Sequence, residues 1–156
     1  MGSNDAPNEI VVFSDFQCPF CKKAAVEMKR LSKKYPNKFR LYFKHFPLSY
    51  HAQSQKAARA AEAARIQGKF WQMHDLLFEY AQELNDKIYL KLAAKLKLDI
   101  EKFSRDFESF KTVNRISADR AEGEILGVDG TPYFIINGTP LTGSYTKIEQ
   151  KLLNPR

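Results

Sequence analysis

The only two cysteines of the chain lie together in the segment Cys18-Pro19-Phe20-Cys21. Residues 9–16, which precede the pair, are compact, β-branched and aromatic, and this predicts a short buried strand. Residues 21–34 place small and apolar side chains at three- and four-residue spacings, which predicts a helix that ends near Pro36. A cysteine pair between a strand and the start of a helix restricts the possible folds more than any other feature of this sequence.

Later segments of the chain are expected to add strands to this strand–helix unit and a closing helix. Residues 38–44 alternate between polar and apolar, so we expect a second strand, parallel to the first, with a right-handed crossover. Residues 131–138 predict a further strand that ends in Asn137-Gly138, a strong hairpin signal. A brief strand over 140–142 and a helix over 144–153 then close the chain, so the order is βαβ, helices, ββα.

The middle of the chain predicts about four helices. The first runs from near Tyr50 to Gly68, the second covers 70–78 and the third covers 86–97. The fourth starts with Asp99 as a possible N-cap and continues towards residue 126, with a possible break. Its aromatic side chains at helical spacing are expected in the core, and these are Phe103, Phe107 and Phe110.

Length and charge exclude several classes of protein. The 156 residues are 44% hydrophobic, which is enough for one domain with a sizeable core and argues against disorder. The net charge of +7 raises the possibility of a nucleic-acid or membrane-surface partner. Because the lysines are scattered over the expected helices and no nucleic-acid-binding motif is present, we expect solvated lysine faces and no nucleic-acid partner.

The cysteine pair has three possible roles. As a structural staple, a bridge across so short a loop would stabilise the fold by only about 2 kcal/mol. As a metal site, it supplies two ligands where structural zinc needs four. His45, His51 and His74 could complete such a site, but they show no paired ligand spacing, so we expect surface or core histidines, and neither metal nor cofactor.

Redox chemistry is the third role, and the sequence favours it. Cys18 is expected at the N-terminus of a helix, where free backbone N–H groups and the positive end of the helix dipole stabilise an anion. A thiolate is the species that attacks or leaves in disulfide exchange. Pro19 suits the first helical turn because it needs no hydrogen-bond acceptor for its nitrogen.

Three segments together resemble the DsbA-like family of thiol–disulfide oxidoreductases. They are FSDFQCPFC, GKFWQMHDLLFE and GVDGTPYFIING, and the similarity runs from about residue 5 to about residue 153. The resemblance implies an α/β thioredoxin-like fold interrupted by a helical subdomain. On this division, residues 1–8 form a polar tail, 9–46 and 128–156 form the thioredoxin-like core, and 47–127 form the inserted subdomain.

The resemblance also implies roles for individual residues. Cys18 would be the exposed nucleophile that forms a mixed disulfide with substrate, Cys21 would be the buried resolving thiol, and Pro19 and Phe20 would support them. Thr131-Pro132 matches the loop whose proline is cis and which faces the cysteines. That loop would offer backbone groups to an extended substrate segment, a form of strand addition.

The sequence departs from the family pattern at two positions. Several members carry a buried acid six residues before the first cysteine, where this chain has Val12. Asp15 is nearer to the cysteines than position 12 is. Its position fits an ordinary polar residue at a strand end as well as it fits a proton-relay acid. Phe20 stands where the best-known oxidases have histidine, so we expect Cys18 to be less acidic than in those enzymes.

The sequence therefore predicts an enzyme that introduces disulfides into cysteine-containing unfolded or partly folded proteins. The family suggests a membrane quinone-linked oxidase, or another electron-transfer partner, that reoxidises it. It also implies a place outside the cytoplasm, in a bacterial periplasm or at the cell-envelope exterior, with the signal or anchor removed. The alternatives are a reductase or isomerase that uses the same site, a Cys/His metal-binding module, and a basic adaptor with incidental thiols.

Overall fold

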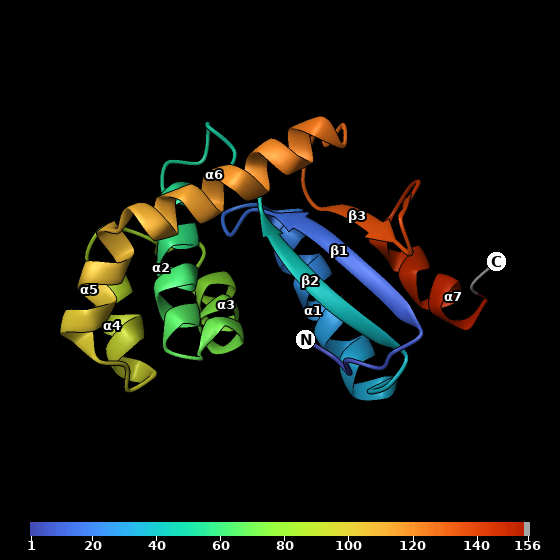
Figure 1. Ribbon diagram of the computed structural model, residues 1–156, viewed down its shortest axis with the longest axis horizontal. Helices are drawn as coiled ribbons and strands as arrows, with labels where there is room; N and C mark the ends of the chain where they lie inside the picture. The colour runs from blue at the N-terminus through green and yellow to red at the C-terminus, as the bar shows by residue number, and fades with distance from the viewer. Residues whose placement is uncertain (155–156) are drawn as a thin grey trace.

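The computed structural model describes residues 1–154, which form a four-stranded mixed sheet and a group of helices beside it (Figure 1). Strand β1 (Asn8–Ser14) pairs in parallel with β2 (Phe39–His45) and antiparallel with β3 (Tyr133–Ile136), which pairs with β4 (Thr139–Pro140). The expected parallel pair and C-terminal hairpin are confirmed. In the hairpin turn, Asn137 and Gly138 both have positive φ angles, as this turn requires.

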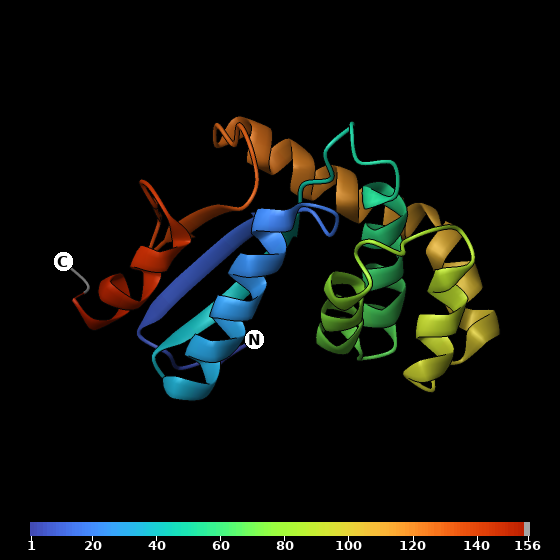
Figure 2. The ribbon, with the colours of Figure 1, turned by 180° about the vertical axis from the view of Figure 1, so that it is seen from behind.

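Helix α1 (Pro19–Lys34) covers one face of the sheet (Figures 1 and 2). The 3-10 helix η1 (Tyr145–Lys147) and helix α7 (Ile148–Leu153) lie on the same side as α1, because Glu149 pairs with both Arg30 and Lys34. Side chains of alternate β1 residues, such as Ile10 and Val12, pack beneath α1 in the main core.

The other helices form a layer beside the sheet, in the order α2 (Ser54–Ile66), α3 (Phe70–Glu79), α4 (Ile88–Lys95), α5 (Ile100–Glu108) and α6 (Phe110–Ile125). Helix α6 runs from this group across to the sheet (Figure 1). There it covers the face opposite α1, where Phe13 packs against Phe46 and Val128. A Cβ at Gly123 would lie 2.8 Å from the Phe46 ring, so glycine permits this close approach.

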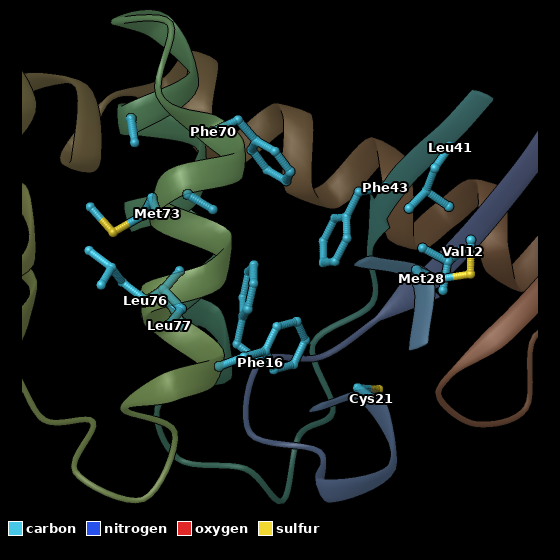
Figure 3. Packing of buried hydrophobic residues seen from close by; sticks show 14 of the residues in the cluster. Val12, Phe16, Cys21, Met28, Leu41, Phe43, Phe70, Met73, Leu76 and Leu77 are labelled. Carbon is cyan, nitrogen blue, oxygen red and sulfur yellow. The ribbon is translucent and has the colours of Figure 1, made fainter. Parts of the chain in front are cut away.

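The helical layer and the sheet share one core. Phe16 and Phe43 stack with ring centroids 5.3 Å apart, and Phe70 of α3 packs on Phe43 (Figure 3). Two predictions about the helices are corrected. The long helix starts at Ser54 rather than near Tyr50, and Phe110 is 86% exposed rather than buried. Ser109 ends α5 and caps α6, so the helical stripe that buries Phe103 stops before Phe110.

The N-terminal residues pair with the sheet instead of forming a detached tail. The backbone of Met1 exchanges two hydrogen bonds with Leu41, and Gly2 forms an isolated bridge with Arg40. The reason is that β2 is an edge strand, whose free N–H and C=O groups attract another extended segment. Asn8, which we assigned to the tail, is the first residue of β1.

Candidate active site

Cys18 is the N-cap residue of helix α1, as the sequence predicts. Its backbone has φ −75° and ψ 121°, and its Sγ accepts a hydrogen bond from the Cys21 N–H at 3.4 Å. Pro19 occupies the first helical position. The sulfur therefore lies at the end of a 16-residue helix where the unpaired amides and the dipole favour negative charge.

The loop before β3 meets the cysteine pair from the other side. The thiol of Cys18 donates to the backbone oxygen of Thr131 at 3.4 Å, across 113 residues of sequence. The peptide bond between Thr131 and Pro132 is cis. The structure thus brings Cys18 and Cys21 together with Thr131 and Pro132, which the sequence placed in one site.

Exposure differs sharply within the motif. Phe20 is 62% exposed and has the Lys23 ammonium over its ring, whereas Cys21 is 1% exposed. Cys18 is only 6% exposed, so the expectation of an exposed nucleophile is wrong for the reduced protein. Its sulfur contacts the Cys21 N–H at the start of α1 and the Thr131 carbonyl.

The two thiols have opposite acidities. The pKa of Cys18 is lowered to about 5, first by the hydrogen bond from the Cys21 thiol, and further by the Thr131 side chain and the amides of Cys21 and Phe20, against the effect of burial. Burial raises the pKa of Cys21 well above its usual range, and the neighbouring Cys18 raises it further. At pH 7 Cys18 is therefore a thiolate and Cys21 a neutral thiol.

A groove of about 390 Å³ lies beside the motif. Its walls include Phe20, Thr131, Pro132, Tyr133 and Tyr145. Among residues 1–154, no hydrogen bond is formed by the backbone N–H of Thr131. The groove therefore offers aromatic side chains and an available backbone donor within reach of the Cys18 sulfur.

Asp15 has a role that the sequence did not reveal. Its carboxylate is fully buried and accepts from the backbone N–H of both Gln17 and Leu48, from the hydroxyl of Ser54 and from the ring of His51. Its own carbonyl accepts from the Cys18 N–H at 3.1 Å. Asp15 therefore ties the segment before the cysteines to the start of the helical layer. The only sequence feature that pointed to this role was the position of Asp15 at the end of the expected strand.

The three histidines do not share a hydrogen-bond partner. His45 contacts Glu62 at 2.8 Å, His51 contacts Asp15, and His74 contacts Asp75. Within the part of the chain that the structure describes, no group of three or more His, Cys, Asp or Glu side chains has the arrangement of a metal site. Nor does any helix in residues 1–154 combine the length and apolar character needed to cross a bilayer.

Comparisons with known proteins agree with this geometry. The family model described as Thioredoxin matches residues 1–152. A thioredoxin-like oxidoreductase from Silicibacter pomeroyi DSS-3 is 30% identical, with a TM-score of 0.84 over 99% of this chain and 89% of that one. The thiol-disulfide exchange protein α-DsbA2 from Wolbachia pipientis is 24% identical, with a TM-score of 0.87 over 99% of this chain and 85% of that one. The chain therefore belongs to the thioredoxin family of its matching model, as a thioredoxin-like oxidoreductase, and its fold is that of DsbA-type thiol–disulfide exchange proteins.

Curated relatives carry a similar stretch within much longer proteins. The Na(+)/H(+) antiporter NhaA 3 of Salinispora tropica is 37% identical over 145 residues, which is 92% of this chain and 22% of that protein. The NhaA antiporter of Herminiimonas arsenicoxydans is 34% identical over 144 residues, which is 92% of this chain and 23% of that protein. This chain spans less than a quarter of their length, so their antiporter activity is not transferred to it.

Proposed function

We propose that the protein introduces disulfides into cysteine-containing unfolded or partly folded proteins through Cys18 and Cys21. The observation that carries the proposal is the position of the Cys18 sulfur at the N-terminus of α1 and beside Thr131, where its surroundings lower its pKa to about 5. A substrate thiolate attacks the Cys18 sulfur of the oxidised pair, and Cys21 leaves. A second substrate thiolate then attacks the substrate sulfur of the mixed disulfide, and Cys18 leaves as a stabilised thiolate.

The magnitude of this stabilisation favours the oxidising direction. At pH 7, lowering a thiol pKa from about 7, the value in thioredoxin, to about 5 stabilises the reduced state by about 2.3 kcal/mol. This corresponds to a rise of about 50 mV above the thioredoxin potential of about −270 mV. A reductase would use the same atoms but would need a lower potential, and an isomerase would need another electron donor to keep it reduced.

The groove beside Phe20 supports the choice of an extended polypeptide as substrate. Residues Thr131 and Pro132 would hold a substrate segment by strand addition, with the free Thr131 N–H as donor. Phe20 would add apolar contact, and Pro19 would keep the first turn of α1 in place. Because so oxidising a pair needs an oxidising compartment, the proposal includes a place outside the cytoplasm and reoxidation by a membrane quinone-linked oxidase or another electron-transfer partner.

A redox titration and an oxidation assay test this function. In glutathione buffers the Cys18–Cys21 pair is expected to have a reduction potential of about −220 mV or higher. A reduction potential near −270 mV would contradict function as an oxidase and favour function as a reductase. The oxidised protein should restore disulfides to a reduced, unfolded ribonuclease, whereas Cys18→Ser should not. A metal-binding module would instead retain zinc or copper after purification, and loss of the metal on Cys18→Ser would identify it.

A further inference from the structure

A small cavity lies next to Cys21, on the side of the sheet that α1 covers. Its volume is about 20 Å³, and it lies between β1, α1 and α3. Nine of its twelve lining residues are apolar, and Val12, Met28, Leu41 and Phe43 among them lie on the Cys21 side of the core (Figure 3). The three others are Ser14, Cys21 and His74, so the polar groups of this cavity include the resolving thiol and a histidine.

The cavity has the size and the partners for one water molecule. A single water needs about 10–15 Å³ of such volume and two to four polar partners. Ser14, Cys21 and His74 supply three. The Ser14 side chain also lowers the pKa of Cys21, against the larger effect of burial.

The hydrogen bonds of His74 fix which ring nitrogen can accept a proton. Its Nδ1 lies 3.1 Å from the Asp75 carboxylate, and Asp75 also pairs with Lys29. A carboxylate can only accept, so Nδ1 carries the hydrogen and Nε2 has the free lone pair. Nε2 forms no hydrogen bond with any atom of residues 1–154. The tautomer is therefore that of a base held ready by a neighbouring acid.

The charges around His74 keep it neutral. Burial lowers its pKa, and Lys29 of α1 and His45 of β2 lower it further, while Asp75 on its own helix opposes them. Burial acts against the Asp75 carboxylate, but its hydrogen bonds with His74 and Lys29 hold its pKa below the usual range. His74 is thus a neutral imidazole beside an ionised carboxylate at pH 7.

We propose that His74 exchanges a proton with the Cys21 thiol through one water molecule in this cavity, and so takes the place of an acid at position 12. In the resolving step, Cys21 gives its proton through the water to Nε2, and its thiolate attacks the Cys18 sulfur. The Cys18–Cys21 bond forms, the bond from Cys18 to the substrate sulfur breaks, and the substrate leaves as a thiolate with the electron pair. In the reverse step, protonated His74 returns the proton to Cys21 as it leaves.

This inference rests on the proposed function, and one experiment separates the two. Reduced protein is mixed with Ellman's reagent: Cys18 attacks first and releases one thionitrobenzoate, and Cys21 then resolves the mixed disulfide and releases the second. His74→Phe is expected to slow the second phase at pH 7 by about tenfold or more, because it removes the proton acceptor. The first phase should stay within about twofold. Absence of a fast first phase in the unsubstituted protein would contradict the proposed function instead.

The pH profile distinguishes proton transfer from packing. Without His74 the second-phase rate should rise about tenfold per pH unit and approach that of the unsubstituted protein at high pH. Trp71→Phe is the matched control, because Trp71 packs on the His74 ring at 5.1 Å but does not line the cavity. Its profile should be unchanged. In the His74→Phe background, Val12→Asp should restore the neutral-pH rate, since Val12 lines the same cavity.

An unchanged second phase in folded His74→Phe would overturn the proposal, as would an equal loss in Trp71→Phe. If the variant does not fold, nitrogen-15 NMR of the unsubstituted reduced protein decides. The proposal requires a protonated Nδ1 and an unprotonated Nε2 on His74. A ring with its hydrogen on Nε2 would overturn it.

Discussion

The Cys18 thiol lies 3.4 Å from the backbone oxygen of Thr131, while the hydroxyl of the same threonine is buried and has no partner among residues 1–154. When Cys18 ionises, its sulfur can no longer donate to the carbonyl. The hydroxyl of Thr131 is then available to donate to the thiolate, and the Thr131 side chain lowers the pKa of Cys18. One residue therefore serves both protonation states of the sulfur.

Thr131→Val should raise the pKa of Cys18 above about 5, because valine keeps the shape of threonine but has no hydroxyl. The measurement is the rate of alkylation by iodoacetamide against pH. Thr142→Val is the control, since Thr142 lies outside the groove beside Phe20. An unchanged Cys18 midpoint in Thr131→Val would show that the hydroxyl does not contact the thiolate.

Cys21→Ala should raise the pKa of Cys18 further than Thr131→Val does. The hydrogen bond from the Cys21 thiol is the largest cause of the lowered pKa, and alanine removes it. The backbone N–H at position 21, which also donates to Cys18, remains. The midpoint should therefore stay below the ordinary value of about 8.5. Thiolate absorbance measures it, and a midpoint lower than in the unsubstituted protein would contradict this assignment.

The sequence predicted those features that depend on local pattern. The place of Cys18 at the start of a helix follows from a strand pattern before it and a helical pattern after it, and the Asn137-Gly138 turn follows from its residue types. The sequence also indicated a possible break in the helix towards residue 126, but not that the break precedes Phe110. The exposure of Phe110 was not predicted, because it depends on where α5 ends and on how α6 leaves it.

The features that the sequence did not predict depend on tertiary packing. Cys18 contacts Thr131, which lies 113 residues away, and no local pattern records that contact. Ser14 and His74 meet Cys21 at one cavity only because α3 packs beside α1 and β1. Asp15 had the sequence context of an ordinary strand end, and only the structure shows the donors that surround its carboxylate.

Asp15→Ala should destabilise the protein by about 3 kcal/mol or more. It leaves the donors of Gln17, Leu48 and Ser54 without their buried acceptor, and each lost hydrogen bond to a charged group costs about 1.5–3 kcal/mol. Urea denaturation measures the free energy of unfolding. Asp129→Ala is the matched control on an exposed aspartate and should change it by less than about 0.5 kcal/mol. Equal effects of the two substitutions would refute the role given to Asp15.

Gly123→Ala should destabilise the protein, although alanine favours a helix over glycine by about 1 kcal/mol. The added Cβ would lie 2.8 Å from the Phe46 ring and 3.0 Å from the Phe13 ring, and such overpacking costs about 1–3 kcal/mol. Ala121→Gly, at an exposed position of the same helix, should show the ordinary helix preference by also destabilising the protein. A more stable Gly123→Ala protein would mean that α6 can move away from the sheet.

The stability of the reduced protein should depend on pH through Cys18. Its pKa is about 5 in the folded protein and about 8.5–9 in the unfolded chain, so the folded state binds fewer protons between these values. The stabilisation is therefore complete above the unfolded pKa and is lost as pH falls through about 5. Relative to Cys18→Ala under reducing conditions, the free energy of unfolding should rise by about 2 kcal/mol from pH 5 to pH 7.

Urea denaturation at several pH values up to 8 measures this difference and avoids the range in which the raised pKa of Cys21 acts with the opposite sign. The oxidised protein has no ionisable thiol at position 18, so its stability should change in parallel with that of Cys18→Ala over the same range. Parallel curves for the reduced protein and Cys18→Ala would show that folding does not stabilise the thiolate. The same stabilisation raises the reduction potential of the pair, so that result would also contradict the proposed direction of disulfide transfer.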